Sequence, residues 1–173
     1  MKILVMIGDS IIGKYFANEI NKNIKLKGII IENKKRSKFR ILKNRLNINP
    51  FLIPYKLIEI FYLTIENRIR TKKIKEYFSK MEFDFKNNLY KINNINSNET
   101  KNIIKSLKPD MGVILGTHII KQDVISLFPF GILNLHTGIL PRYRGLRSEF
   151  WALYNKDFNN IGVSIIKIDR GID

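Results

Sequence analysis

The sequence predicts an α/β protein whose β-sheet is doubly wound and mostly parallel. Short apolar segments that have the composition of buried strands, such as residues 2–7 and 111–115, alternate with segments of helical spacing. A first strand, a turn, a helix and a second strand all lie within residues 2–32, which is the pattern of a βαβ unit. Such units pair their strands in parallel through right-handed crossovers, so this order predicts the sheet type.

The first unit is the clearest. Residues 2–7 are an apolar run that predicts a buried strand, and Gly8, Asp9 and Ser10 form the turn after it. Residues 11–21 have apolar side chains at helical spacing, with Ser10 as the expected N-cap. The run LKGIIIE at residues 26–32 predicts the second strand.

Residues 34–90 interrupt this alternation and predict a basic, largely helical insertion. Between residues 34 and 91 there are 16 Lys or Arg and 5 Asp or Glu, and Pro50 and Pro54 divide the segment. Two interpretations of the charge remain open: a general bias toward Lys, Asn and Ile, or a patch that attracts nucleic acid, an acidic membrane or a phosphorylated substrate.

An apolar stripe at helical spacing runs through this insertion. Its residues are Tyr55, Ile58, Phe61, Tyr62 and Ile65. We expect the stripe to pack on the edge of the sheet, with an interfacial membrane helix as the alternative because the polar residues around it are basic.

The alternation of strands and helices resumes after the insertion. The predicted strands are residues 89–92, 111–115, 132–136 and 161–168. The predicted helices are residues 97–107, 122–127 and 145–154, the first capped by Ser97 or Thr100. Together these elements predict one Rossmann-like domain over residues 1–173, with the insertion at 34–90.

Composition narrows the possible functions. The 173 residues contain no Cys, which excludes a disulfide framework, a thiolate metal site and a cysteine nucleophile, and we expect no metal. The N-terminus lacks the features of a signal peptide, and no apolar run reaches the roughly 20 residues of a membrane helix. We therefore expect a cytoplasmic protein without a membrane span, whose net charge of +16 is high.

The strongest candidate site follows the strand predicted at residues 132–136. Side chains alternate along a strand, so Asn134 and His136 project to the same face. They lie at the carboxyl end of that strand, where open α/β sheets bind their ligands. A polar pair on an apolar strand is costly unless its hydrogen bonds are satisfied or used, so His136 is either a satisfied core histidine or a functional one.

Three separated blocks of the sequence resemble the formyltetrahydrofolate-dependent formyltransferases. NLHTGILPRYRG, which begins at Asn134, is similar to the family signature Asn-x-His-x-Ser-Leu-Leu-Pro. FWALYNKD followed by IGVSIIKIDRGID resembles the family's helix, strand and Gly-Leu-Asp-Thr-Gly loop, and IGDSIIGKYFANEI followed by LKGIIIE resembles one branch of it. The family includes enzymes that act on methionyl-tRNA, on phosphoribosylglycinamide and on amino sugars.

This resemblance implies a catalytic set of Asn134, His136 and Asp173. Asn134 would donate hydrogen bonds to the oxyanion of a tetrahedral intermediate, and His136 would pair with that oxyanion and relay a proton. Asp173 would orient the imidazole and take the proton of the amine through water, with Asp169 as a competing carboxylate. Formyltetrahydrofolate would be the co-substrate.

The resemblance also implies where the two substrates bind. The pterin ring would contact two segments, the loop LGTHII and the loop before the catalytic Asp. Their residues are Leu115, Gly116, Thr117, His118, Ile119, Ile120, Asp169 and Gly171. The acceptor would contact Gly8, Asp9 and Ser10 at a helix N-terminus, together with Arg142 and Arg144.

Two departures from the family pattern bear on function. Gly138 stands where the signature has Ser, which removes a hydroxyl group. The family continues with Thr-Gly after its Asp, whereas this sequence ends at Asp173, so we expect a fragment that lacks the C-terminal part of the domain.

These observations leave three interpretations of function. The first, which the sequence favours, is formyl transfer to a primary amine of an amino-sugar nucleotide, a small phosphorylated acceptor. The second is a methionyl-tRNA formyltransferase-like fragment, in which the basic insertion contacts tRNA. The third is a truncated, non-catalytic module that binds folate or nucleic acid. The sequence does not indicate an oligomeric state.

Overall fold

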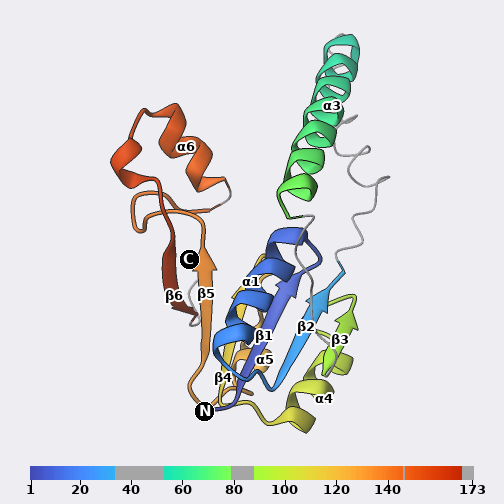
Figure 1. Ribbon diagram of the computed structural model, residues 1–173, viewed down its shortest axis with the longest axis vertical. Helices are drawn as coiled ribbons and strands as arrows, with labels where there is room; N and C mark the ends of the chain where they lie inside the picture. Colours follow the sequence, from blue (N-terminus) through green and yellow to red (C-terminus); the bar gives the residue numbers. More distant parts are fainter. Residues whose placement is uncertain (34–52, 79–87, 146, 169–173) are drawn as a thin grey trace. The chain divides into compact units, whose positions relative to one another are not determined.

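A computed structural model describes residues 1–33, 53–78, 88–145 and 147–168 of the chain (Figure 1). By its internal contacts the chain divides into two compact units. One consists of Met1–Asn33 with Phe83–Asp173, and the other of Lys34–Glu82. Each unit is described by itself below.

The first unit is built on a mostly parallel β-sheet, which confirms the predicted fold class. Its described strands are β1 (Ile3–Gly8), β2 (Gly28–Glu32), β3 (Leu89–Ile92), β4 (Met111–Leu115), β5 (Ile132–His136) and β6 (Ser164–Ile168). They are ordered β3-β2-β1-β4-β5-β6, and only β6 is antiparallel to its neighbour, as its reversed arrow shows (Figure 1). Chain order reverses between β1 and β4, the kind of position where α/β sheets bind ligands.

Helices alternate with these strands as the sequence predicts. They are α1 (Ile11–Asn23), α4 (Asn98–Leu107), α5 (Gln122–Ile125) and α6 (Ser148–Tyr154), followed by a 3-10 turn, η2 (Phe158–Asn160). Both predicted caps are present: Ser10 Oγ accepts the N–H of Gly13 at 3.0 Å, and Ser97 Oγ accepts that of Thr100 at 3.2 Å. These bonds fix where α1 and α4 begin.

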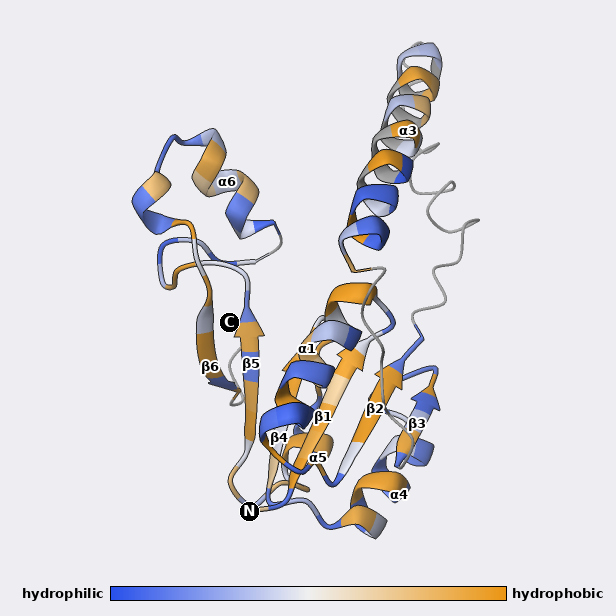
Figure 2. Ribbon diagram, in the orientation of Figure 1, coloured by the Kyte–Doolittle hydropathy of each residue, from blue (hydrophilic) through white to orange (hydrophobic). Residues whose placement is uncertain are grey.

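The sheet has an apolar cluster on each face, and alternate residues of β1 contribute to each. Leu4 and Met6 join the cluster under α4 and α5, whereas Val5 and Ile7 join the one under α1. All four side chains are fully buried, which explains why this strand is continuously apolar in sequence and in Figure 2. Ile132 of β5 belongs to the cluster under α4 and α5. Asn134 and His136 lie on that same face because they follow at intervals of two.

Two predicted boundaries are wrong near the candidate site. Helix α6 begins at Ser148 rather than at residue 145, because Gly145 (φ 79°) and Arg147 (φ 58°) both have left-handed backbone. Strand β6 begins at Ser164 rather than at residue 161, because pairing with β5 starts where Ser164 lies opposite His136. Apolar composition alone did not reveal either turn.

In the second unit the structure describes one long helix, α3 (Ile53–Tyr77). Pro54 lies in its first turn, where the missing N–H costs no helical hydrogen bond. The predicted apolar stripe is on this helix and is exposed, for example at Ile58 and Phe61. Hydrophilic residues gather in its C-terminal half (Figure 2). No helix among the described residues is both long and apolar enough to cross a membrane.

Candidate active site at the carboxyl end of the sheet

The ends of β1 and β4 approach each other closely at the point where chain order reverses. Ile7 pairs with Leu115, so Gly8 lies beside Gly116. A Cβ on Gly8 would collide with the carbonyl of Gly116, whereas Gly116 itself has left-handed backbone (φ 68°). The two predicted binding loops therefore start side by side.

The residues of the first loop are engaged with neighbouring elements. The N–H of Asp9 donates to the carbonyl of Glu32 at 3.0 Å, and its carboxylate forms an ion pair with Lys14 at 2.7 Å. The hydroxyl of Ser10 caps α1. The role of this loop in binding the acceptor stays a prediction.

A buried carboxylate, Glu32, holds the second loop and was missed by the sequence analysis. Its side chain is fully buried at the end of β2. Oε2 accepts the N–H of His118 at 2.8 Å, and Oε1 accepts that of Ile95 at 2.8 Å. The Nδ1 of His118 lies 3.0 Å from Oε1. One carboxylate thus joins β2 to the loops that follow β3 and β4.

These hydrogen bonds decide the charge state of Glu32. Burial by itself would raise the pKa of Glu32, but the hydrogen bonds from His118 and Ile95 outweigh it and hold this pKa below its ordinary value of 4.5. The carboxylate is therefore ionised at neutral pH, and it only accepts hydrogen bonds.

Asn96 is a second, independent support of the same loop. Its Nδ2 donates to the carbonyl of Ile119 at 2.9 Å, and its Oδ1 accepts the N–H of Lys121 at 2.8 Å. Together with Glu32 it fixes three backbone groups between His118 and Lys121. A loop held by outside side chains in this way needs little rearrangement to bind a ligand.

The held loop keeps several backbone donors open. Among the described residues, the N–H groups of Thr117, Ile119 and Ile120 have no hydrogen-bond partner. Ile120 anchors the loop with a buried side chain, while Ile119 is exposed. Such a loop can offer hydrogen bonds to the edge of a flat heterocycle.

Asn134 and His136 lie on β5, the strand next to β4, from whose end this loop leaves. Asn134 pairs with Ile114 of β4 and with Ile166 of β6, and His136 pairs with Ser164. The carboxamide of Asn134 is half-buried and has no hydrogen-bond partner in the part of the chain that the structure describes. It can therefore donate to a ligand.

The ring of His136 is buried and is held by the segment that follows β5. Its Nε2 lies 3.1 Å from the carbonyl oxygen of Tyr143 and 3.3 Å from the hydroxyl of Ser148. A carbonyl oxygen only accepts, so Nε2 carries the proton in this contact. Ser148 donates its own proton to the carbonyl of Gly145 at 3.1 Å.

Arg142 is tied to the protein through Asp157. Its Nε lies 2.8 Å from Oδ2 of Asp157, which also accepts the hydroxyl of Tyr143 at 3.0 Å. The hydrogen bond from Asn160 lowers the pKa of Asp157 most, and Tyr143 and Arg142 add to this effect against the cost of burial. The bond to Asp157 fixes the loop that presents the Tyr143 carbonyl to His136. Arg144 is exposed.

The other predicted site residues, Asp169, Gly171 and Asp173, lie outside the described residues. Within the described part of the chain, no cluster of His, Asp or Glu could hold a metal ion. The sequence analysis missed Glu32, Asn96 and Ser148. One signal was available for Glu32, because a charged residue closing a strand of buried isoleucines requires a partner.

Comparison with known proteins decides the family. The sequence pattern of the formyl transferase family matches residues 59–173. The chain belongs to this family. Its segments align with methionyl-tRNA formyltransferases from Dictyoglomus thermophilum (42% identity over 73 residues) and Fusobacterium nucleatum (30% over 122 residues). The two alignments cover 42% and 69% of this chain, but only 23% and 39% of those relatives.

Solved structures of formyltransferases share the fold. Phosphoribosylglycinamide formyltransferase from Anaplasma phagocytophilum superposes with a TM-score of 0.59 at 12% identity, covering all of this chain and 67% of that one. A 4-N formyltransferase from Francisella tularensis superposes with a TM-score of 0.50 at 14% identity, covering 99% and 52% of the two chains. At these identities the likeness establishes the formyl transferase fold alone.

Replacing the buried carboxylate should make the stability less dependent on pH. The pKa of Glu32 is lower in the folded than in the unfolded chain, so its contribution is present above about pH 4.5 and is lost as the pH falls through the lowered value. At pH 7, Glu32→Gln should lower the free energy of unfolding by about 2 kcal/mol, measured by urea denaturation.

The difference between wild type and Glu32→Gln should shrink below about pH 4.5. Glu19→Gln is the matched control, because the carboxylate of Glu19 forms a surface ion pair with Lys22. We expect this control to stay within about 0.5 kcal/mol of wild type. A difference that is equal at pH 7 and pH 3 would contradict the role given to the ionised carboxylate.

Proposed function

We propose that the protein transfers a formyl group from formyltetrahydrofolate to a primary amine. One observation carries the proposal: the half-buried carboxamide of Asn134 and the fixed ring of His136 share one face at the end of β5. Among the described residues this carboxamide has no hydrogen-bond partner, and the loop after the neighbouring strand β4 keeps backbone donors open. Membership of the formyl transferase family supports it.

The 116–120 loop fits the pterin of a folate. A pterin has a flat edge of ring nitrogens and a carbonyl oxygen, and the open N–H groups of Thr117, Ile119 and Ile120 are complementary to its acceptors. The supports from Glu32 and Asn96 hold these groups in place before binding.

The chemistry requires stabilisation of a developing oxyanion. The acceptor nitrogen attacks the formyl carbon, a C–N bond forms, and the carbonyl electron pair moves to oxygen. The amide N–H groups of Asn134 would donate to that oxygen. The electron pair then returns, the bond to the folate nitrogen breaks, and that nitrogen gains one proton while the acceptor loses one.

His136 is the group for moving that proton. Its Nε2 already carries a proton in the contact with Tyr143, so Nδ1 can accept one from the attacking amine and return it to the leaving nitrogen. The imidazolium formed in between would also stabilise the oxyanion. Asp173 stays the proposed partner that orients this step.

For the acceptor, we favour the aminoacyl group of a tRNA over an amino-sugar nucleotide. The two curated relatives described above are methionyl-tRNA formyltransferases, and both alignments reach at least 30% identity. The amino-sugar nucleotide, which the sequence favoured, has weaker support, because the fold of the 4-N formyltransferase is shared at 14% identity.

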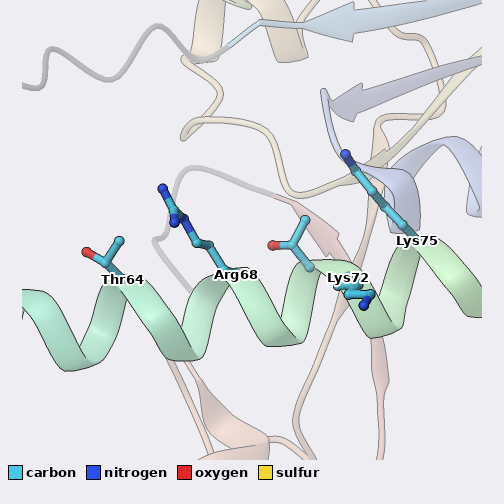
Figure 3. Close-up of a pocket in the computed structure, with 5 residues that line it drawn as sticks. Thr64, Arg68, Lys72 and Lys75 are labelled. Carbon is cyan, nitrogen blue, oxygen red and sulfur yellow. The ribbon is translucent and has the colours of Figure 1, made fainter.

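The second unit adds an independent observation in favour of an anionic polymer. A hollow on α3 is lined by Thr64, Arg68, Thr71, Lys72 and Lys75 (Figure 3). Thr64, Arg68 and Lys75 point to the same side of the helix. The lining thus has three cationic and two hydroxyl side chains, and proteins use both kinds to contact phosphate oxygens of nucleic acids.

Removing the imidazole should separate binding from catalysis. In His136→Ala the proton carrier is lost, so formyl transfer, measured by the release of tetrahydrofolate, should fall below detection. Affinity for a non-hydrolysable formylfolate analogue, measured by titration calorimetry, should change by less than about threefold. Turnover close to wild type would contradict the role of His136. Absence of analogue binding by the folded wild-type chain would favour the non-catalytic interpretation.

Removing the carboxamide should act on the transition state. Asn134→Ala should lower kcat by about 100- to 1,000-fold with little change in KM for formyltetrahydrofolate, because an oxyanion donor is lost. Asn155→Ala is the matched control, since Asn155 is an exposed carboxamide just beyond α6. A change in KM alone would show that Asn134 binds substrate without stabilising the oxyanion.

The two acceptor classes differ in their response to salt and to α3. With aminoacyl-tRNA as acceptor, replacing Lys72 and Lys75 by Gln should raise KM. The slope of log kcat/KM against log salt concentration should become less steep by about two, because two phosphate contacts are lost. Lys105→Gln, an exposed position on α4, is the control. Formylation of a nucleotide-linked amino sugar that is unaffected by the α3 variants would reverse our choice of acceptor.

A further inference from the structure

The side chain of Ser148 and the carbonyl of Tyr143 fill the space next to His136 that a side chain at position 138 would need. A Cβ on Gly138 would lie 2.5 Å from the Cβ of Ser148, 2.9 Å from its Oγ and 2.7 Å from the carbonyl oxygen of Tyr143. A Cβ atom essentially never approaches other atoms within 3.0 Å. A side chain at position 138 and the side chain of Ser148 therefore exclude each other in this conformation.

Ser148 is built into this place by several contacts. It is the first residue of α6 and is 1% exposed. Its Oγ donates to the carbonyl of Gly145 at 3.1 Å and lies 3.3 Å from Nε2 of His136. The hydroxyl has one proton, and because that proton goes to Gly145, the oxygen can only accept from the imidazole.

Two oxygens therefore accept from one ring nitrogen. The carbonyl of Tyr143 and the hydroxyl of Ser148 both face Nε2, and neither has a proton to give it. This arrangement favours the tautomer with the proton on Nε2 and leaves Nδ1 with its lone pair. Among the described residues, Nδ1 of His136 has no hydrogen-bond partner.

We propose that Ser148 is a positioning residue of the reaction, which helps to fix the ring of His136 and its tautomer, and that Gly138 is glycine because Ser148 and the carbonyl of Tyr143 leave no space for a side chain there. The proposal rests on the function proposed above. Ser148 acts through His136 and need not touch either substrate. The hydroxyl that position 138 lacks is supplied from the N-terminus of α6.

The tautomer can be measured without any activity. The chain has two histidines, so His118→Gln leaves the imidazole of His136 as the only one to give nitrogen signals in a long-range ¹H–¹⁵N NMR spectrum. Near pH 7.5 we expect a protonated Nε2 and an unprotonated Nδ1. Ser148→Ala should shift both signals part of the way toward the average of the two tautomers, because only the Tyr143 carbonyl then accepts from Nε2. A proton on Nδ1 in the otherwise unmodified chain would overturn the proposal.

Kinetics supply the second readout. Ser148→Ala should lower kcat by about three- to tenfold, the effect of one hydrogen bond, with KM for formyltetrahydrofolate unchanged. Gly138→Ser alone should lower kcat more, because its side chain collides with Ser148. The double variant Gly138→Ser/Ser148→Gly removes the contact with Ser148 and returns a hydroxyl to this place, so it should recover part of the lost kcat, while the close approach to the Tyr143 carbonyl remains.

Reciprocal rescue separates positioning from general damage. The melting temperature should fall in Gly138→Ser and should rise again in the double variant, because the collision with the side chain of Ser148 is removed. A double variant that is no better than Gly138→Ser in kcat and in tautomer would overturn the proposal. If the wild-type chain transfers no formyl group, the proposed function fails, while the NMR experiment still tests the positioning of His136.

Discussion

The parallel pairing of β1 with β4 is the constraint on which the site depends. It places the end of β1 against the end of β4 at the point where chain order reverses, and Gly8 has room for no side chain there. Every loop that leaves the sheet nearby must accommodate this contact. The 116–120 loop therefore turns away through the left-handed backbone of Gly116, toward the end of β2.

A buried charge makes that turn stable. The carboxylate of Glu32 would be very unfavourable at the end of an isoleucine strand without partners, and the loops after β3 and β4 supply them. Because the buried carboxylate needs both hydrogen bonds, the loops after β3 and β4 must keep the conformations that supply them. Asn96 holds the same loop a few residues further on, through hydrogen bonds to the backbone of Ile119 and Lys121. The open donors of Thr117 and Ile119 keep their positions because their neighbours are held.

The sequence predicted the parts of the structure that depend on local pattern. Apolar periodicity located the strands, serine caps located the start of α1 and α4, and alternation along β5 placed Asn134 and His136 on one face. Contacts between distant residues were not predictable, because no local signal reports them. Glu32 and His118 are 86 positions apart, and nothing in the spacing of either indicates the other. Turns with left-handed backbone at residues other than glycine, such as Arg147, also escaped prediction.

The same distinction explains why a sequence motif is an incomplete description of this site. The residues of NLHTGILPRYRG identify a family, but the ring of His136 is held by a backbone carbonyl and by a side chain beyond the motif. Every residue has a backbone carbonyl, so the identity of the side chain at Tyr143 does not predict this contact. What fixes it is the geometry of the loop, which depends on the bond between Tyr143 and Asp157 and on the bonds of Ser164 to Gly138 and Leu140. A histidine at this position can therefore be oriented by different neighbouring residues, provided that its Nε2 donates to a hydrogen-bond acceptor.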